Sequence, residues 1–216
     1  MRTTPRKILN IVLPIAVFGA WLHMALKAGG MLSSAGIGSL KYFTVLSNML
    51  EGAACILWLA FRRGKEGGSH WTERLKYVAA VAVFVTLTVV MVFFGPLYGY
   101  RNMLGGANLW FHLLVPVAAV LEQIFLSEYI ASRKDNLLAG LPALLYGLVY
   151  RVNLLLNGVG EEPFSNDWYG FLLWGWPVGF AIFGAIILLS LGLGWILRKA
   201  GKSRETQKQS ITGGKS

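Results

Sequence analysis

The chain has 216 residues, of which 55% are hydrophobic and only 14% are charged. Its mean hydropathy is +0.56, and the charges avoid several windows of about 20 residues, the length of a membrane-spanning helix. This composition excludes an ordinary water-soluble domain and predicts an all-α polytopic membrane protein. The net charge of +10 does not indicate nucleic-acid binding, because the basic residues stand in short segments between apolar spans.

Six apolar segments are expected to cross the membrane as a single helical bundle. In chain order they cover residues 8–28, 41–61, 77–94, 108–126, 137–157 and 168–197. The first is read as an uncleaved span, because its apolar run is long and no clear cleavage site follows it. The loop at residues 62–76 is polar and strongly basic. We therefore expect one domain over residues 1–197 and a basic, disordered tail over residues 198–216.

Lysine and arginine are distributed unequally between the two sides of this bundle. Sixteen lie on the side of both termini, three lie on the opposite side, and Arg151 lies within the fifth span. The positive-inside rule therefore predicts that both termini are cytoplasmic. The third span contains no charge, and its pattern predicts only a lipid-facing wall.

The second span carries more polar side chains than a segment that only faces lipid would tolerate. Thr44, Ser47, Asn48 and Glu51 recur at intervals of three and four residues, so they share one face of a helix. Because hydrocarbon cannot hydrogen-bond a hydroxyl, an amide or a carboxylate, this face must look into the protein or into a wet cavity. The functional site is expected along this face.

Polar groups of other spans are expected at a similar depth. Counted along their own spans, Thr44, His23, His112, Arg151 and Asn153 lie roughly 5 to 9 Å below the outer surface. Ionisable residues within a membrane indicate a functional site by default, because each is costly to insert. The convergence of four helices on one layer therefore predicts a shared site.

A threonine that faces a histidine in such a layer predicts nucleophilic catalysis. The hydroxyl of Thr44 is a weak nucleophile until a base removes its proton, and His112 suits that role near neutral pH. Asn48 or Arg151 could donate hydrogen bonds to the developing oxyanion. No carboxylate is expected near His112, so the pattern favours a dyad over a triad. In the structural alternative, Thr44 bonds a backbone carbonyl and His112 anchors its helix at the interface.

Further polar residues have two interpretations each. The stripe on the fifth span could line the pocket or face the bundle core, and it consists of Tyr146, Tyr150, Asn153 and Asn157. Arg151 could hold the carboxylate of a lipid acid in a bidentate fork, or it could pair with Glu51 or with backbone carbonyls. His23 could extend the polar layer or simply pack. Glu122 and Gln123 are expected to bond between helices.

No metal or other cofactor is expected. The three histidines stand apart, without an acidic or histidine partner at ligand spacing. The single cysteine, Cys55, allows neither a cysteine-rich metal site nor an internal disulfide framework.

Two short motifs carry a resemblance to a known family. K-Y-F-T-V-L-S-N at residues 41–48 and F-H-L-L-V-P at residues 111–116 resemble the androgen-induced and androgen-dependent multipass membrane hydrolases and their bacterial relatives. Looser matches are P-x-x-x-Y at residues 142–146 and P-F-x-x-D at residues 163–167. The resemblance implies that Thr44 is the nucleophile, that His112 is its partner, and that fatty acid esters of hydroxy fatty acids are hydrolysed. The S-N pair after the threonine is typical of the bacterial branch and implies a bacterial plasma membrane.

Other functions remain open at this point. A small transporter or channel would use the same polar layer as a substrate or proton site. A non-enzymatic lipid-binding protein would need no nucleophile at Thr44, and an acyltransferase would pass the acyl group to a lipid alcohol instead of water. The expected partners are a lipid ester and the bilayer, and the sequence does not indicate an oligomeric state.

Overall fold

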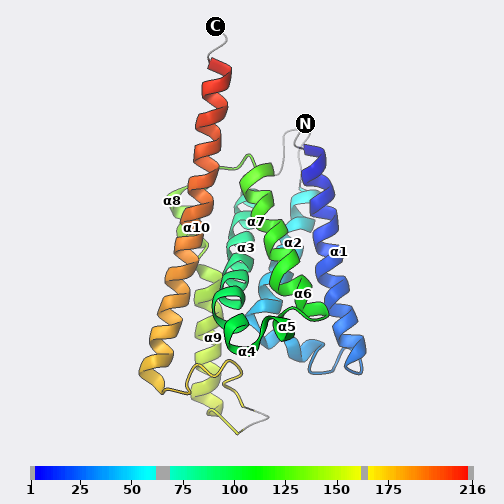
Figure 1. The fold of residues 1–216 in the computed structure, drawn as a ribbon, viewed down its shortest axis with the longest axis vertical. Helices are drawn as coiled ribbons and strands as arrows, with labels where there is room; N and C mark the ends of the chain where they lie inside the picture. Colours follow the sequence, from blue (N-terminus) through cyan, green and yellow to red (C-terminus); the bar gives the residue numbers. More distant parts are fainter. Residues whose placement is uncertain (1–2, 62–68, 162–164, 214–216) are drawn as a thin grey trace.

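The computed structural model describes residues 3–61, 69–161 and 165–213 (Figure 1). Six helices in these parts are long and apolar enough to cross a membrane: Thr4–Lys27, Phe43–Ala60, His70–Tyr98, Ala107–Leu126, Arg133–Asn157 and Trp176–Gln207. The described residues contain no β-strand. The expected all-α class and the expected number of spans are confirmed at this level.

The spans are built from shorter elements with defined bounds. The first half of the chain comprises α1 (Thr3–Lys27), η1 (Ile37–Lys41), α2 (Phe43–Ala60), α3 (His70–Val89), η2 (Val90–Phe94), α4 (Gly95–Tyr98) and α5 (Tyr100–Met103). The fourth span joins α6 (Ala107–Leu109), η3 (Trp110–Leu114), α7 (Val115–Leu121) and η4 (Glu122–Leu126), and the remainder comprises α8 (Arg133–Leu138), α9 (Leu141–Asn157) and α10 (Trp176–Gly213). Both η3 and η4 are π-helical turns, which often mark functional positions in helices.

Helix α3 lies at the centre of the bundle, where it packs against α2, α7 and α10 (Figure 1). Its residues 79–83 read A-A-V-A-V, and each of these side chains is at most 1% exposed. Small side chains let neighbouring helices approach α3 closely on several sides. The expectation that this span is only a lipid-facing wall was therefore wrong, since absence of charge does not separate a lipid-facing helix from a buried one.

Helix α3 also begins earlier than the sequence predicts. Residues 70–76, which were expected in a polar loop, form its first two turns, and Glu73 and Lys76 are buried there. Within this stretch, Glu73 and Lys76 belong to ion pairs inside the protein, whereas His70 and Trp71 are exposed. Residues 62–68, which carry other basic residues used to predict orientation, lie outside the described part of the chain.

The sixth span differs from its prediction at both ends. It begins at Trp176 rather than near residue 168, because Gly170 and Gly175 adopt positive φ angles of 67° and 82° that end a helical path. At its other end α10 continues to Gly213, although a disordered tail is expected from residue 198. The guanidinium of Arg204 donates hydrogen bonds to the carbonyls of Ile124, at 2.8 Å, and Ser127, which holds this extension against the end of the fourth span. Residues 214–216 lie outside the described part.

Gly147 lets α9 and α10 approach each other closely. A Cβ atom at this position would lie 1.4 Å from a ring carbon of Phe183. We expect Gly147→Ala to lower the free energy of unfolding by about 1–3 kcal/mol, because the phenylalanine must shift in a packed core. Chemical unfolding in detergent, followed by circular dichroism, measures this change. Gly184→Ala is the matched control, because its Cβ would meet nothing within 4 Å; equal stabilities of the two variants would contradict the packing argument.

Candidate active site

Thr44 is the second residue of α2, at the end of the bundle opposite the chain termini. Tyr42 is the N-cap residue, with an extended backbone at φ −91° and ψ 132°, and its carbonyl accepts the first backbone hydrogen bonds of the helix from Val45 and Leu46. The backbone N–H of Phe43 is left for a side chain to satisfy. The start of α2 thus places Thr44 next to the Phe43 N–H and the side-chain hydroxyl that accepts its hydrogen bond.

The Thr44 hydroxyl differs from other threonine hydroxyls in the bundle. Thr72 and Thr88 donate to the backbone carbonyls of Ser69 and Phe84, both at 2.8 Å. Such bonds are the usual structural use of threonine in helices. Within the described residues, no hydrogen bond to the Thr44 hydroxyl was found, and its side chain lines two cavities.

His112 lies on the π-helical turn η3 of the fourth span. Its Nδ1 atom is 2.6 Å from the backbone carbonyl oxygen of Met103, which accepts a hydrogen bond. Because a carbonyl only accepts, Nδ1 carries the proton, and Nε2 of the neutral ring has a free lone pair. The Met103 carbonyl therefore orients the imidazole as a carboxylate would in a triad.

Thr44 and His112 line the same cavity, which has a volume of about 830 Å³. Asn48 connects their helices, since its side-chain nitrogen donates to the carbonyls of Thr44 at 2.7 Å and Phe111 at 3.0 Å. One amide thus holds the backbone of Thr44 and the residue next to His112. Both side chains therefore border one cavity, and their catalytic roles remain a proposal.

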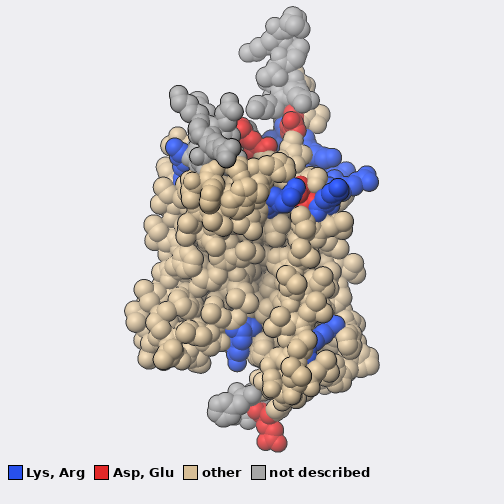
Figure 2. All heavy atoms as spheres, turned by 180° about the vertical axis from the view of Figure 1, so that it is seen from behind, with Lys and Arg blue, Asp and Glu red and all other residues tan. Residues whose placement is uncertain are grey.

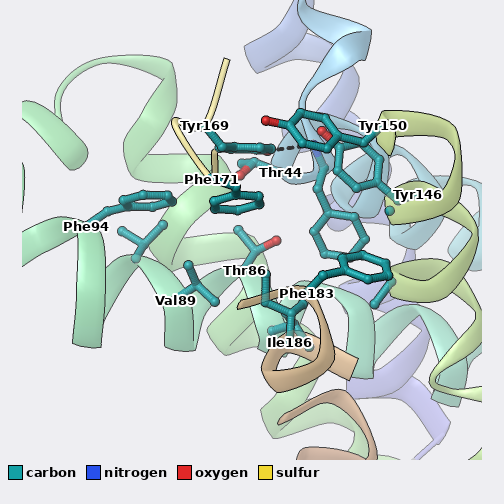
Figure 3. A pocket seen from close by; sticks show the side chains of 15 residues that line it. Thr44, Thr86, Val89, Phe94, Tyr146, Tyr150, Tyr169, Phe171, Phe183 and Ile186 are labelled. Carbon is teal, nitrogen blue, oxygen red and sulfur yellow. Dashed lines mark hydrogen bonds between the residues drawn. The ribbon is translucent and has the colours of Figure 1, made fainter. Parts of the chain in front are cut away.

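A second, smaller cavity of about 60 Å³ adjoins Thr44 and is mainly apolar. Figure 3 shows Thr44 at this cavity, below the ring of Tyr169, with Phe183 and Ile186 from α10 on the opposite side. Thr44 therefore lies at the junction of a large cavity with polar groups and a narrow apolar space. This arrangement suits an apolar chain attached to a polar reacting group.

The segment at residues 165–175 closes the site over the start of α2. The hydroxyl of Tyr169 accepts a hydrogen bond from the Phe43 N–H at 2.8 Å. Asp167 anchors the segment, because it accepts the Tyr150 hydroxyl and the backbone N–H groups of Phe171 at 2.9 Å and Leu172 at 2.8 Å. Sequence reasoning placed these residues in a loop and in the sixth span, and it missed Tyr169. Two sequence features could have indicated this segment. They are Gly170 and Gly175, which end a helical path, and the P-F-x-x-D motif, whose Pro163 lies outside the described residues.

Two expected site residues on α2 are engaged elsewhere. The side-chain nitrogen of Asn48 is already hydrogen-bonded to two carbonyls, so it cannot serve as the oxyanion donor that the sequence suggested. The Ser47 hydroxyl shares a hydrogen bond of 3.0 Å with the Thr86 hydroxyl on α3. Both residues hydrogen-bond α2 to neighbouring helices, so this part of the polar face of α2 has a structural role.

Four further expected residues do not line the large cavity. The Arg151 guanidinium lies 4.0 Å and 4.3 Å from the ring centres of Phe180 and Phe183 and donates to the Gly179 carbonyl at 3.5 Å, and no ion pair with Glu51 is present among the described residues. His23 is exposed on α1. Asn153 lines a separate cavity of about 470 Å³ between α2 and α9. Glu51 is fully buried and bonds Lys76. A similar predicted depth below the membrane surface therefore did not indicate a shared site, because the helices present these side chains in different directions.

Tyr150 has an intermediate position. Its ring borders the small cavity beside Thr44 and the cavity of Asn153, and its hydroxyl donates to Asp167. It supports the closing segment and is not expected to contact the reacting atoms.

On one face of the molecule, charged side chains lie at the two ends and not between them. On the face shown in Figure 2, lysine and arginine gather at the end that carries the termini, and the middle band is free of charge. This distribution agrees with six helices that cross an apolar layer.

Comparisons with protein-family models, with curated proteins and with solved structures gave no match for this chain.

Proposed function

We propose that the protein is an intramembrane lipid ester hydrolase in which Thr44 is the nucleophile and His112 the general base. The observation that carries the proposal is a cavity shared by two side chains: Thr44, whose hydroxyl has no hydrogen bond within the described part of the chain, and His112, whose tautomer is set by Met103. The resemblance of residues 41–48 and 111–116 to the androgen-induced hydrolase family supports the same two roles. It also suggests fatty acid esters of hydroxy fatty acids as substrates.

The reaction proceeds by acyl transfer in two steps. Thr44 Oγ1 attacks the ester carbonyl while His112 Nε2 takes the hydroxyl proton, and His112 then gives this proton to the leaving alkoxide as the C–O bond breaks. Water next attacks the acyl-threonine with His112 as base. Collapse of this second intermediate releases the acid, and the proton returns to Thr44. The substrate is proposed to reach the cavity laterally from the leaflet at this end of the bundle, and the positive-inside rule predicts that this leaflet is the outer one.

Tyr169 is the side chain that we assign to stabilise the oxyanion. Its hydroxyl stands at the N-terminus of α2 beside the N–H of Phe43, one residue from the nucleophile. Burial raises the pKa of Tyr169 to about 12, so the phenol keeps its proton and can donate it at neutral pH. The positive end of the α2 dipole points to the same place and favours negative charge there.

Tyr169→Phe is therefore expected to lower kcat about 10²-fold with little change in KM, because an oxyanion donor acts mainly in the transition state. The measurement is steady-state hydrolysis of a long-chain ester by purified protein in detergent. Tyr100→Phe is the matched control, since this exposed hydroxyl donates to the Met91 carbonyl at 2.8 Å outside the site. A kcat that falls less than about threefold in Tyr169→Phe would remove the residue from the mechanism.

The function itself is tested by turnover of a fatty acid ester of a hydroxy fatty acid in proteoliposomes. Wild-type protein should release both acids, and His112→Ala should reduce the rate at least about 10²-fold, the usual contribution of a general base. Release that is unchanged in His112→Ala would contradict the dyad. Transport of the ester without its cleavage would favour a transporter instead.

A further inference from the structure

A second polar centre lies at the opposite end of the bundle, near the chain termini, and it has no part in the proposed hydrolysis. We call it the core cluster. It comprises Arg6 and Asn10 of α1, Glu51, Cys55 and Trp58 of α2, Glu73 and Lys76 of α3, and Glu122 of η4. Its five charged residues are at most 7% exposed.

The cations of the core cluster are fully engaged. Arg6 forms a bidentate pair with Glu73, with N–O distances of 2.8 and 2.7 Å, and its Nε atom donates to Glu122 at 3.0 Å. The Lys76 ammonium lies 2.9 Å from Glu122, and it also bonds Glu51. The expectation that Glu122 bonds between helices is confirmed by its contacts with α1 and α3.

The carboxylates of the core cluster outnumber its cations. Three glutamates face two basic side chains, and no further cation pairs with these glutamates among the described residues. An uncompensated charge in an apolar interior costs several kcal/mol, and a carboxylate in that position takes up a proton instead. The charges balance when one of the three glutamates is neutral.

Glu51 has the fewest donors of the three glutamates. Glu73 accepts bonds from Arg6 and from the Trp58 indole at 2.8 Å, and one oxygen of Glu122 accepts from Arg6 and Asn10. The other oxygen of Glu122 has no hydrogen-bond partner among the described residues, but it lies 2.9 Å from the Lys76 ammonium as an ion pair. Glu51 receives one strong donor, Lys76, and the weak thiol donor of Cys55 at 3.5 Å. Its second oxygen is buried without any partner among the described residues. Its anionic form is therefore the least stabilised of the three.

We propose that the core cluster holds one proton in addition to those of its cations and that Glu51 carries it. A metal ion is a weaker occupant, although donor atoms of Glu51, Cys55 and Glu122 lie within 4.8 Å of one another. The Lys76 ammonium is 3.0 Å from the Cys55 sulfur and bonds both carboxylates, so it already fills the position of a cation. Release of the proton would leave one negative charge where α1, α2, α3 and η4 meet.

Infrared spectroscopy of the full chain in lipid nanodiscs at neutral pH tests this proposal, which does not depend on the hydrolase function. The wild type and the exposed control Glu161→Gln should show the carbonyl stretch of a protonated carboxylic acid, and Glu51→Gln should lack it. A spectrum without this band in the wild type, or with the band retained in Glu51→Gln, would overturn the proposal.

Thermal unfolding provides a second readout that does not rely on band assignment. Glutamine closely resembles a protonated glutamate in shape and charge, so Glu51→Gln should keep the wild-type Tm, whereas Glu122→Gln should lower it. If Glu51→Gln destabilises the protein as much as Glu122→Gln, Glu51 is ionised and the proposal fails.

Discussion

Thr44→Ala should abolish ester hydrolysis, with a loss in kcat of at least about 10³-fold, because no acyl intermediate can form without the hydroxyl. The side chain lines a cavity and no hydrogen bond to its hydroxyl was found within the described residues, so the substitution should leave the fold intact. Initial rates of acid release from a long-chain ester, with Tm measured in parallel, separate loss of chemistry from loss of structure.

Thr88→Ala provides the matched control for this experiment. It removes the same atoms from α3, where the hydroxyl donates to the Phe84 carbonyl at 2.8 Å and faces no reacting group. We expect wild-type activity in this variant. Full activity in Thr44→Ala, or equal losses in both variants, would contradict a nucleophilic role for Thr44.

Lys76→Met should reduce the free energy of unfolding by about 3–5 kcal/mol, the typical cost of removing one partner from a buried ion pair. The ammonium is 0% exposed and lies between Glu51 and Glu122, so its loss leaves Glu122 with only its Arg6 and Asn10 contacts. Unfolding of the purified protein in detergent by a denaturing surfactant measures the change.

Lys134→Met serves as the control, since Lys134 is exposed at the start of α8. Its substitution should change stability by no more than about 0.5 kcal/mol. If Lys76→Met proves as stable as Lys134→Met, the core cluster does not contribute to folding in the way that its geometry indicates.

Hydropathy alone located six spans because each helix must present about 20 apolar residues to lipid. It misjudged where α3 begins, because the partners of Glu73 and Lys76 are Arg6, Glu51 and Glu122, which are distant in the sequence. A local pattern cannot distinguish charges that face water from charges that pair within a bundle. The same limit explains why the charge-free residues 77–94 were assigned to the lipid face.

The candidate site shows what a helical pattern can and cannot supply. The spacing of Thr44 and Asn48 identified a polar face, and the position of His112 in its span placed it at the same end of the bundle. The partners of these side chains depend on tertiary structure: the Met103 carbonyl sets the tautomer of His112, and Asn48 uses its donors to join two helices. Tyr169 reaches the site through a folded segment that no helical periodicity predicts.

The central claim is that Thr44 forms a covalent acyl intermediate with the help of His112. Treatment of the purified protein with a fluorophosphonate, followed by proteolysis and mass spectrometry, locates the nucleophile directly. We expect an adduct on Thr44 in the wild type, a much slower reaction in His112→Ala, and no adduct in Thr44→Ala. An adduct that persists in Thr44→Ala, or ester turnover by a wild-type protein that never labels at Thr44, would contradict this claim.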